Sequence, residues 1–509
     1  MLIHVDRESR TPLYLQIKNQ IRDMIFSGVL SPGFRLPPER KLAETLNVNR
    51  STVLNAYHEL KADRLIESRV GCGTVVLEPH SAARGQNAPF ACPEPIHWRQ
   101  FFSVTSSRQQ NPLLQDLMQL LHRREDVISF SLGIPAVELY PISVFQDIQS
   151  EILKKHGQAT LSFLPTEGYY PLRESISRFM RKSGAAVSPE EILVLSGSQQ
   201  GIDLAARTLI DPGDVILAEE PSFFCAVQVF RSAGARVIGV PIDENGMRTD
   251  LLESFLARYK PKFIYTIPNF QNPSGTVMSP ERRRQMLNLA YSYRTPILED
   301  DAYGELRYEG QPVTSLKALD QHGYVIYLST FSKTLSPGVR IGWLAAARPV
   351  IRQIVMAKQL NDIHTNSLAQ FVLDGFLRRG LFEQHLQMIR QEYVKRRNMM
   401  MDALQKSMLP GVCWNVPEGG LYLWCRLPER IDKSTVLLMR AIDQGVTFVP
   451  GEAFYLEEQG CNHIRLNFAL QPKGVIEEGV KRLVKALRET LVSTESLEKE
   501  IKAQTNPLF

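Results

Sequence analysis

The sequence lacks the long apolar runs of membrane proteins. No stretch of its 509 residues approaches the roughly 18 uninterrupted apolar residues of a membrane-spanning helix. The first residues show no positively charged region followed by an apolar core, as a secretory signal would. We therefore expect no membrane partner and a cytoplasmic location.

Cysteine is scarce and has no functional spacing. The six cysteines contain no metal-type or redox Cys-x-x-Cys pair: they are Cys72, Cys92, Cys225, Cys413, Cys425 and Cys461. In a chain of this size, such scatter is typical of free thiols in a reducing compartment. We expect neither a disulfide framework nor a metal site.

An excess of charge of one sign is also missing. The formal net charge is only +5, and residues 1–78 hold 11 Lys and Arg against 9 Asp and Glu. Bulk charge therefore does not by itself indicate a nucleic-acid partner. The composition, 44% hydrophobic and 22% charged, is that of a globular chain, long enough for about two to four domains.

The first part of the chain has the pattern of a helix-turn-helix. Apolar residues at helical spacing predict a first helix between Pro12 and Leu30, which ends near Gly28. A short second helix is predicted over 39–46, and a third from about Arg50 to Ala62 after a tight break. Asn49 is a suitable N-cap for this third helix.

Two short strands and a linker follow. Residues 65–76 alternate and turn on glycines, which predicts a two-stranded wing with Arg69 near its tip. Residues 78–95 are rich in Pro, Ala, Ser, Gly and Asn and read as a flexible linker. The predicted first domain is therefore 1–77.

The remaining chain alternates short apolar strands with helical segments. Such alternation predicts an α/β fold with a mostly parallel sheet covered by helices. We place this domain at 96–493, with a smaller α+β subdomain over about 380–493, and regard 494–509 as a polar tail.

One stretch of this large domain carries recognisable chemistry. Lys333, in Phe-Ser-Lys-Thr, supplies an amine for an aldehyde cofactor, and Arg340 supplies a guanidinium for its phosphate. Pyridoxal phosphate (PLP) also needs an acid opposite its pyridine nitrogen, donors for its ring oxygen, a phosphate cradle and an aromatic ring on its face. Each can be found where a predicted strand ends or a helix begins.

Each motif alone is weak evidence for a PLP site, and the argument depends on their occurring together in this order. Ser198 and Gln199 lie in a Gly/Ser loop that opens a helix, where backbone N–H groups stabilise a phosphate. Asp300 ends a strand, with Tyr303 three residues on, and Asn272 stands in an Asn-Pro-Ser-Gly turn. Each could alone be an ordinary turn, but chance occurrence of all of them together is improbable.

With these motifs in view, residues 127–488 resemble fold-type I aminotransferases of the aspartate and kynurenine aminotransferase branch. The resemblance assigns Lys333 to the Schiff base, Asp300 to the ring nitrogen, and Tyr303 and Asn272 to the ring oxygen. It assigns the phosphate to Arg340, Ser198, Gln199, Thr330 and Ser332, and ring stacking to Phe223. Arg465 matches the arginine that binds a substrate carboxylate, and Gly133 the glycine beside it.

One position departs from the family pattern. Phe163 stands where the family usually has a tyrosine that donates to the cofactor phosphate of the neighbouring subunit. Because phenylalanine has no hydroxyl, it cannot make that bond. We expect somewhat weaker cofactor retention unless another donor, such as Tyr169 or Tyr170, replaces it.

The first domain resembles the winged helix-turn-helix of GntR-type regulators, in Pro12 to Ile17, Pro32 to Arg40, Leu42-Ala43 and Gly71 to Thr74. The resemblance implies double-stranded operator DNA as a partner. Its expected contacts are Arg35, Arg40, Arg50, Ser51, Thr52, Arg69 and Gly71. A small protein-binding winged helix is the alternative. Arg64 stands where glycine is common, and we expect it to be solvated.

The combination resembles the MocR subfamily of transcription regulators. It implies a homodimeric, PLP-dependent regulator whose aminotransferase-like domain senses an amino compound, or PLP itself, through Lys333. The competing reading is a functional aminotransferase with a DNA-binding appendage, since every residue required for transamination is present. The sequence names neither the effector nor the target genes.

Overall fold

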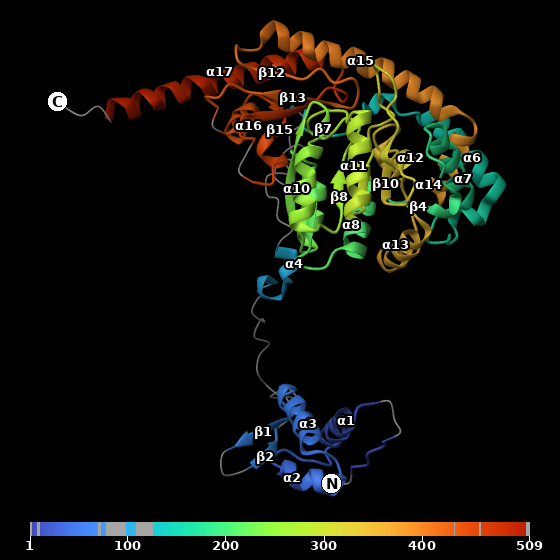
Figure 1. Ribbon diagram of the computed structural model, residues 1–509, viewed down its shortest axis with the longest axis vertical. Helices are drawn as coiled ribbons and strands as arrows, with labels where there is room; N and C mark the ends of the chain where they lie inside the picture. Colours follow the sequence, from blue (N-terminus) through green and yellow to red (C-terminus); the bar gives the residue numbers. More distant parts are fainter. Residues whose placement is uncertain are drawn as a thin grey trace, which may run out of the picture. The chain divides into compact units, whose positions relative to one another are not determined.

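The computed structural model describes residues 3–7, 11–69, 73–77, 98–107, 126–431, 433–457 and 460–504. The chain divides into two compact units, Met1–Trp98 and Arg99–Phe509, and each is considered by itself. Figure 1 labels their elements. The predicted linker over 78–95 and the predicted DNA contact Gly71 lie outside the described residues.

The three predicted helices of the first unit are confirmed. They are α1 (Leu13–Phe26), α2 (Glu39–Leu46) and α3 (Arg50–Ala62). The break between α2 and α3 begins at Asn47, which is left-handed with φ of 50°. Asn49 caps α3, since its side chain accepts a hydrogen bond from the Ser51 backbone N–H at 3.3 Å.

The predicted wing is present as β1 (Ile66–Arg69) paired antiparallel with β2 (Gly73–Val76). Fourteen buried side chains form the core of this unit, among them Ile17, Ile21, Val53 and Tyr57, each with 0% exposure. Arg64 is exposed as expected, and its φ of 54° lies in the left-handed region. That backbone conformation favours glycine, which explains why glycine is common at this position.

The second unit is built on an eight-stranded sheet in the order β4-β11-β10-β9-β8-β5-β6-β7. Its central pairs are parallel, as predicted, whereas β11 runs antiparallel to both neighbours and β7 to β6. The strands are β4 (Ile192–Leu195), β5 (Val215–Glu220), β6 (Arg236–Asp243), β7 (Gly246–Met247), β8 (Ile264–Thr266), β9 (Ile297–Asp300), β10 (Val325–Thr330) and β11 (Gly342–Ala345).

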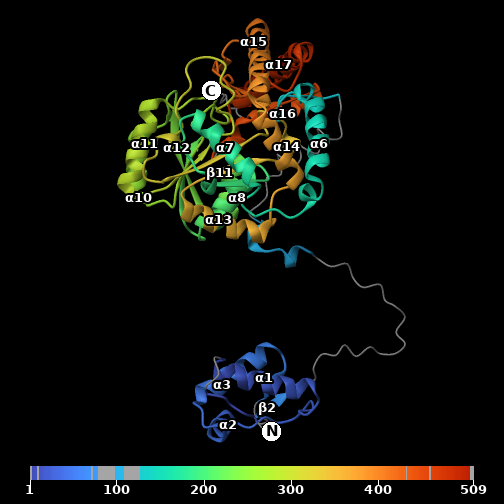
Figure 2. The ribbon, with the colours of Figure 1, turned by 90° about the vertical axis from the view of Figure 1, so that its right-hand side faces the viewer.

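Helices cover both faces of this sheet because alternate residues of each strand point to opposite sides. Leu217, Ile264 and Ile297 pack with α10 (Thr249–Tyr259), α11 (Pro280–Tyr293) and α12 (Leu316–Leu319). Their neighbours Ile216, Tyr265 and Leu298 belong instead to the core that includes α8 (Ser198–Leu209) and α9 (Phe224–Ser232). Figure 2 shows α10, α11 and α12 grouped together, apart from α8.

Shorter and peripheral helices complete the larger part of the unit. They are α4 (Val104–Ser107), α6 (Ile142–His156), α7 (Tyr170–Lys182), α13 (Arg348–Asn361) and α14 (Ser367–Arg378). Among the described residues, no helix combines the length and apolar character needed to cross a membrane.

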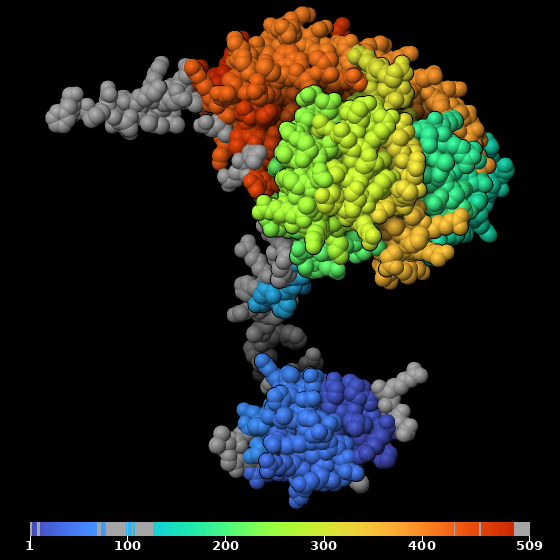
Figure 3. All heavy atoms as spheres, viewed as in Figure 1, coloured from blue at the N-terminus to red at the C-terminus, as the bar shows by residue number. Residues whose placement is uncertain are grey.

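The smaller subdomain follows α14. It contains α15 (Leu381–Ser407), α16 (Ser434–Asp443), α17 (Lys473–Gln504), and the antiparallel sheet β12-β13-β16-β15. The strands of that sheet are β12 (Cys413–Trp414), β13 (Tyr422–Arg426), β15 (Val449–Pro450) and β16 (His463–Asn467). In Figure 3 this orange and red part packs directly against the green and yellow sheet domain.

Two features of the subdomain differ from a simple reading of the sequence. β14 (Val446–Thr447) pairs in parallel with β3 (Ile128–Ser129), so a segment from near the start of the unit joins the C-terminal subdomain. α17 continues to Gln504, into the predicted polar tail. Glu, Lys, Leu, Ala and Gln are frequent among its last residues, and these are good helix formers.

Candidate functional site: a cofactor cavity

A cavity of about 320 Å³ lies where the parallel strands of the large sheet end. All twelve residues predicted for the cofactor and the ligand carboxylate line it: Gly133, Ser198, Gln199, Phe223, Asn272, Asp300, Tyr303, Thr330, Ser332, Lys333, Arg340 and Arg465. They come from seven separate segments. The fold therefore brings the sequence motifs together at one site.

Lys333 follows β10 and reaches into the cavity. Its Nζ donates a hydrogen bond to the Gly133 carbonyl oxygen at 2.5 Å, and the residue is half-buried. A Cβ at position 133 would lie 2.2 Å from the Tyr422 hydroxyl oxygen, so only glycine fits there. This glycine allows its segment to approach both Lys333 and Tyr422.

Asp300, the last residue of β9, is buried at 4% exposure. Its Oδ2 accepts a hydrogen bond from the Tyr265 hydroxyl at 2.8 Å, whereas its Oδ1 is buried and has no partner. Burial raises the pKa of this carboxyl from 3.8 to about 6, although the Tyr265 bond opposes the shift. A cationic or N–H partner at Oδ1 would relieve this cost.

Tyr303 and Asn272 both line the cavity, and their side chains are hydrogen-bonded to each other. The Asn272 amide donates to the Tyr303 hydroxyl at 3.4 Å, and the hydroxyls of Tyr303 and Tyr422 are 3.3 Å apart. Burial raises the pKa of Tyr303 well above its usual value. At Tyr422 burial acts in the same direction, but the positive charges of Arg465 and Lys333, together with the hydrogen bond to Tyr303, lower the pKa. Tyr303 is therefore the stronger candidate for a neutral O–H donor.

A helix N-terminus and an arginine side chain meet at the cavity. Gly197, with φ of 96°, precedes α8, so Ser198 and Gln199 stand at a helix N-terminus. Arg340 donates through Nη2 to the Ser196 carbonyl oxygen at 2.7 Å, which holds the guanidinium beside that loop. Thr330 donates to Ser332 at 3.0 Å.

Arg465, on β16, is buried at 4% exposure without a carboxylate partner. Its Nη1 donates to the Asn272 side-chain oxygen and its Nη2 to the Ser131 carbonyl, both at 2.8 Å, while Nε has no partner. The guanidinium lies 4.0 Å from the centre of the Tyr422 ring. A buried guanidinium without an anion is costly, so this geometry favours an anionic ligand.

Phe223 precedes α9 and lines the same cavity, and its ring centre is 5.5 Å from that of Phe224. Phe163 does not line it. The Phe163 side chain is 78% exposed and packs edge-on against His364, with 5.5 Å between the ring centres. The position at which the sequence departs from the family pattern is thus on the surface of this chain.

Sequence reasoning missed two residues that shape the site. Tyr422 contacts Arg465, Tyr303 and the Gly133 segment, and Tyr265 binds the carboxylate of Asp300. Both lie within apolar strands, where an aromatic residue usually belongs to the core. Their hydroxyl groups were the available signal, because a buried Tyr O–H needs a partner.

In the first unit, the predicted DNA contacts come from α2, α3, β1 and the segment before α2. Arg50, Ser51 and Thr52 form the first turn of α3, with Arg50 and Ser51 exposed and Thr52 half-buried. Arg50 is 3.5 Å from Glu39 of α2. Arg35 and Arg40 are exposed, Arg69 ends β1, and Gly71 is outside the described residues.

The donor set of the cavity fits PLP. Asp300 Oδ1 is a buried acceptor without a partner, as a protonated ring nitrogen requires. A helix N-terminus with an arginine beside it suits a phosphate, and a primary amine reaches the space between them. The mixture of one acid, one amine and two arginines is what a zwitterionic, phosphorylated aldehyde needs.

Comparison with protein families matches both units. Residues 125–483 match the family "Aminotransferase class I and II", and residues 13–76 match "Bacterial regulatory proteins, gntR family". PLP is the cofactor of the first family and of this chain. A gntR-family domain binds DNA.

Two full-length relatives share both parts. The uncharacterized HTH-type transcriptional regulator YisV of Bacillus subtilis is 33% identical over 96% of this chain and 98% of its own. The probable rhizopine catabolism regulatory protein MocR of Rhizobium meliloti is 29% identical over 95% of each chain.

Among solved structures, the kynurenine aminotransferase of Pyrococcus horikoshii, in complex with PMP, is similar to the second unit. It is 40% identical, with a TM-score of 0.74, over 78% of this chain and 98% of its own. This likeness covers the fold described above and leaves the first unit unmatched. The chain therefore belongs to the aminotransferase class I and II family and, because a gntR-family domain precedes that part, to the MocR-type helix-turn-helix regulators.

Proposed function

We propose that this protein is a PLP-dependent transcription regulator whose aminotransferase-like unit senses a carboxylate-bearing amino compound, or PLP itself. One observation carries the proposal: a single chain holds a winged helix with an exposed α3 N-terminus and a cavity lined by all twelve predicted ligand-binding residues. The ligand can change DNA affinity only through its differential binding to two arrangements of the protein, typically about 1–3 kcal/mol.

Each group of the cofactor is assigned to its own set of cavity residues. Asp300 would accept from the ring nitrogen through Oδ1, while Tyr303 and Asn272 would donate to the ring oxygen. The α8 N-terminus and Arg340 would hold the phosphate, and Phe223 would pack on the ring. When bound, PLP supplies an aldehyde that condenses with primary amines. Lys333 is the resident amine that would hold it.

Arg465 selects the ligand. Its Nε–H has no partner, and its two bonded N–H groups contact neutral oxygens that a carboxylate can displace. Because β16 belongs to the smaller subdomain and Asn272 to the large sheet domain, a carboxylate at Arg465 acts on the contact between them. The effector class is therefore amino carboxylates.

A homodimer is part of the proposal. Large apolar side chains stand exposed around Phe163: Leu161 is 75% exposed, Leu360 91% and Ile363 52%. The contact of Phe163 with His364 places these segments next to each other. A second copy covering this patch would bury it, and a twofold dimer predicts paired or repeated half-sites in the operator.

The DNA contacts follow from the winged helix. The exposed first turn of α3 presents Arg50 and Ser51, with Arg35, Arg40, Thr52 and the wing residues Arg69 and Gly71 as further contacts. A gel shift on the DNA flanking the protein's own gene tests this. We expect salt-sensitive, sequence-selective binding, and its absence would count against a regulatory role.

Ligand sensing is tested by titrating the PLP-loaded protein with a panel of amino compounds, with and without operator DNA, while visible absorption is recorded. A responsive compound should change the spectrum at a concentration that depends on DNA. Lys333→Ala should remove the absorption of lysine-bound PLP while the folded structure remains. If that absorption persists in Lys333→Ala, another lysine holds the cofactor.

A second function is favoured by the completeness of the same cavity. Arg465, Asp300 and Lys333 are all in place for transamination, and the 40% identical structure is a kynurenine aminotransferase. Incubation with candidate amino acids and a keto acid separates the two functions. A sensor gives at most one turnover per site, whereas sustained product at ordinary enzyme rates would establish an aminotransferase.

A further inference from the structure

A second cavity, of about 440 Å³, lies on the other side of the β9 strand end. The residues after β9 alternate between the two spaces. Asp300, Ala302 and Tyr303 line the cofactor cavity, whereas Asp301, Gly304, Glu305, Arg307 and Tyr308 line the second one. Its size is within the range of small-molecule sites. Nothing in the proposed function uses it.

Arg307 lines this cavity and has a hydrogen-bond donor without a described acceptor. Its side chain is only 10% exposed, and Phe270 packs against the guanidinium at 4.9 Å. Nη1 donates to Glu418 at 2.6 Å and to the Glu309 carbonyl oxygen at 3.1 Å. Nη2 is buried and has no hydrogen-bond partner among the residues that the structure describes. A buried guanidinium N–H that lacks an acceptor costs free energy that a ligand oxygen would recover.

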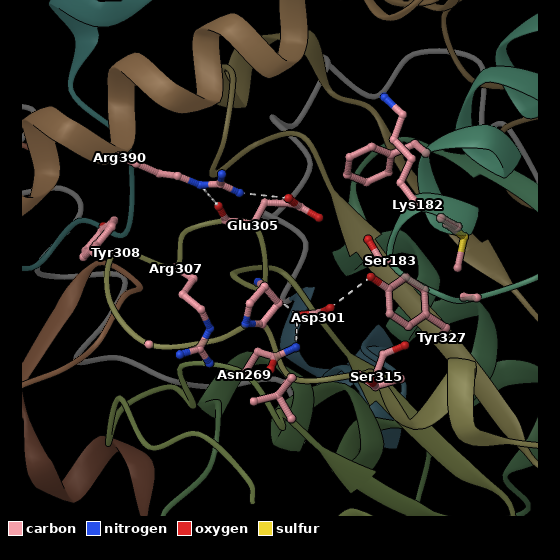
Figure 4. Close-up of a pocket in the computed structure, with 18 residues that line it drawn as sticks. Lys182, Ser183, Asn269, Asp301, Glu305, Arg307, Tyr308, Ser315, Tyr327 and Arg390 are labelled. Atoms are coloured by element: carbon pink, nitrogen blue, oxygen red, sulfur yellow. Dashed lines mark hydrogen bonds and ion pairs between the residues drawn. The ribbon is translucent and has the colours of Figure 1, made fainter. Parts of the chain in front are cut away.

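The other charges around the cavity are already paired. Arg390 extends from α15 to Glu305, with hydrogen bonds at 2.6 Å to its carbonyl and 3.1 Å to its carboxylate. Asp301 accepts from Asn269, Gly304 N–H and the Tyr327 hydroxyl, each at 3.0 Å. Figure 4 shows Arg390 reaching Glu305, and Asp301 between Asn269 and Tyr327, with the Arg307 guanidinium directed toward Asn269.

The charges at the cavity limit the class of ligand. Three cations line it, Lys182, Arg307 and Arg390, and each is already paired with a carboxylate: Glu383, Glu418 and Glu305, respectively. Asp301 lines the cavity as a further acid, so a dianionic phosphate would be repelled more strongly than a monoanion. Burial also raises the pKa of Glu305 and of Asp301, which weakens their repulsion of a monoanion.

The cavity wall is shared with the cofactor site. Residues 306–309 are hydrogen-bonded to 418–420: Gly420 N–H donates to the Leu306 carbonyl at 2.9 Å, and Tyr308 N–H to that of Glu418 at 2.8 Å. Tyr303 precedes the first segment and Tyr422 follows the second, and both line the cofactor cavity. A ligand at Arg307 therefore touches the loop that positions these two hydroxyls.

We propose that the second cavity binds a small monocarboxylate through Arg307, and that its occupancy is coupled to the cofactor cavity through the loop that both share. The Arg307–Glu418 pair joins the large sheet domain to the smaller subdomain. A carboxylate at Nη2 strengthens that junction by adding a second anion to the same guanidinium.

Trifluoroacetate, followed by fluorine NMR on the PLP-loaded full-length protein, is the probe. We expect two classes of saturable site, one removed by Arg465→Lys and the other weakened at least tenfold by Arg307→Lys, equivalent to about 1.4 kcal/mol. Arg307→Lys retains a cation for Glu418 and loses only the second nitrogen. Arg284→Lys, the same change at an exposed arginine of α11, is the matched control and should leave both classes intact.

A second variant protects the test against misfolding. Ser183 is exposed at the rim of the cavity, so Ser183→Trp should block the Arg307 class without disturbing the core. If both Arg307→Lys and Ser183→Trp bind trifluoroacetate like the wild type, the cavity has no such site.

Coupling is read in the Arg465→Lys background, where acetate binding in the cofactor cavity is strongly weakened. Acetate should change the visible spectrum of lysine-bound PLP in that variant, and adding Arg307→Lys should abolish the change. An unchanged spectrum despite binding would disprove the coupling. Both Arg307 and Ser183 variants keep operator binding and the PLP spectrum, so failure here leaves the proposed regulator intact.

Discussion

Asp300 and Asp301 are adjacent in sequence and both buried, yet they face different surroundings. Asp301 is saturated by three donors, from Asn269, Gly304 and Tyr327. Asp300 has one donor, Tyr265, and one oxygen without a partner. The first arrangement stabilises the folded chain, whereas the second keeps an acceptor available for a ligand. Polar groups left unsatisfied by the protein thus indicate the functional side of β9.

The largest expected effect is on the free energy of unfolding, which should fall much more when Asp301 is replaced than when Asp300 is. Asp301→Ala leaves three buried donors unpaired and should lower the free energy of unfolding by about 4 kcal/mol. Asp300→Ala leaves one and also removes a costly buried charge, so we expect about 1 kcal/mol or less. Urea unfolding of the cofactor-free protein, followed by fluorescence of Trp343, Trp414 and Trp424, measures both. Equal losses would remove the distinction.

The next prediction concerns the pH dependence of the free energy of unfolding of the cofactor-free protein. Because burial raises the pKa of Asp300 from 3.8 to about 6, the folded state binds this proton more tightly than the unfolded state. Its contribution to stability is therefore lost as pH rises through that interval. Relative to Asp300→Asn, the cofactor-free wild type should lose about 2 kcal/mol between pH about 4 and about 6.

The control for the pH prediction is the PLP-loaded protein. A protonated ring nitrogen at Oδ1 favours the ionised carboxylate, so the same comparison should become flat or change sign. If the difference in free energy of unfolding between the cofactor-free wild type and Asp300→Asn does not vary with pH, the Asp300 carboxyl is better hydrated than its 4% exposure suggests.

The next effect concerns the binding of amino carboxylates to Arg465 in the cofactor cavity. Arg465→Lys keeps the charge but loses the fork that binds a carboxylate through two nitrogens. Binding of amino carboxylates should weaken by about 2 kcal/mol, or roughly thirtyfold. Visible titration of the PLP-loaded protein measures this. Amines without a carboxylate serve as the control, and their affinity should not change.

The smallest expected effect concerns the phosphate end. Phe163→Tyr restores a hydroxyl that, in the proposed dimer, reaches the cofactor phosphate of the second copy. PLP should bind more tightly by about 1 kcal/mol, as measured by equilibrium dialysis. Leu161→Tyr, in the same exposed patch, is the matched control. Equal gains in both variants would point to general surface effects instead of a phosphate contact.

Much of the fold was predictable because its signals are local. The helices of the first unit follow from apolar spacing and the Asn49 cap. The parallel strands follow from apolar runs that end in motif residues. Those strand-end motifs also brought Asp300, Thr330 and Lys333 to one cavity, since the carboxyl ends of parallel strands meet at one edge. Gly133 and Arg465 were assigned from the family resemblance alone, and they line the same cavity.

What escaped prediction depends on contacts between distant segments. Tyr422 is 119 residues from Tyr303 along the chain, and no local pattern marks it as a site residue. The antiparallel direction of β11 follows from its pairing with β4 and β10, which periodicity does not reveal. The second cavity is assembled from α7, the loop after β9, β10 and α15, so no single motif could have indicated it.

The pairing of β3 with β14 joins a segment from near the start of the second unit to the smaller subdomain. Four residues after β3, the Gly133 carbonyl accepts a hydrogen bond from the Lys333 amine. One short segment therefore contacts the smaller subdomain at β14 and the large sheet domain at Lys333. Any change in the hydrogen bonding of Lys333 is thus made within four residues of a strand that belongs to the sheet with β14.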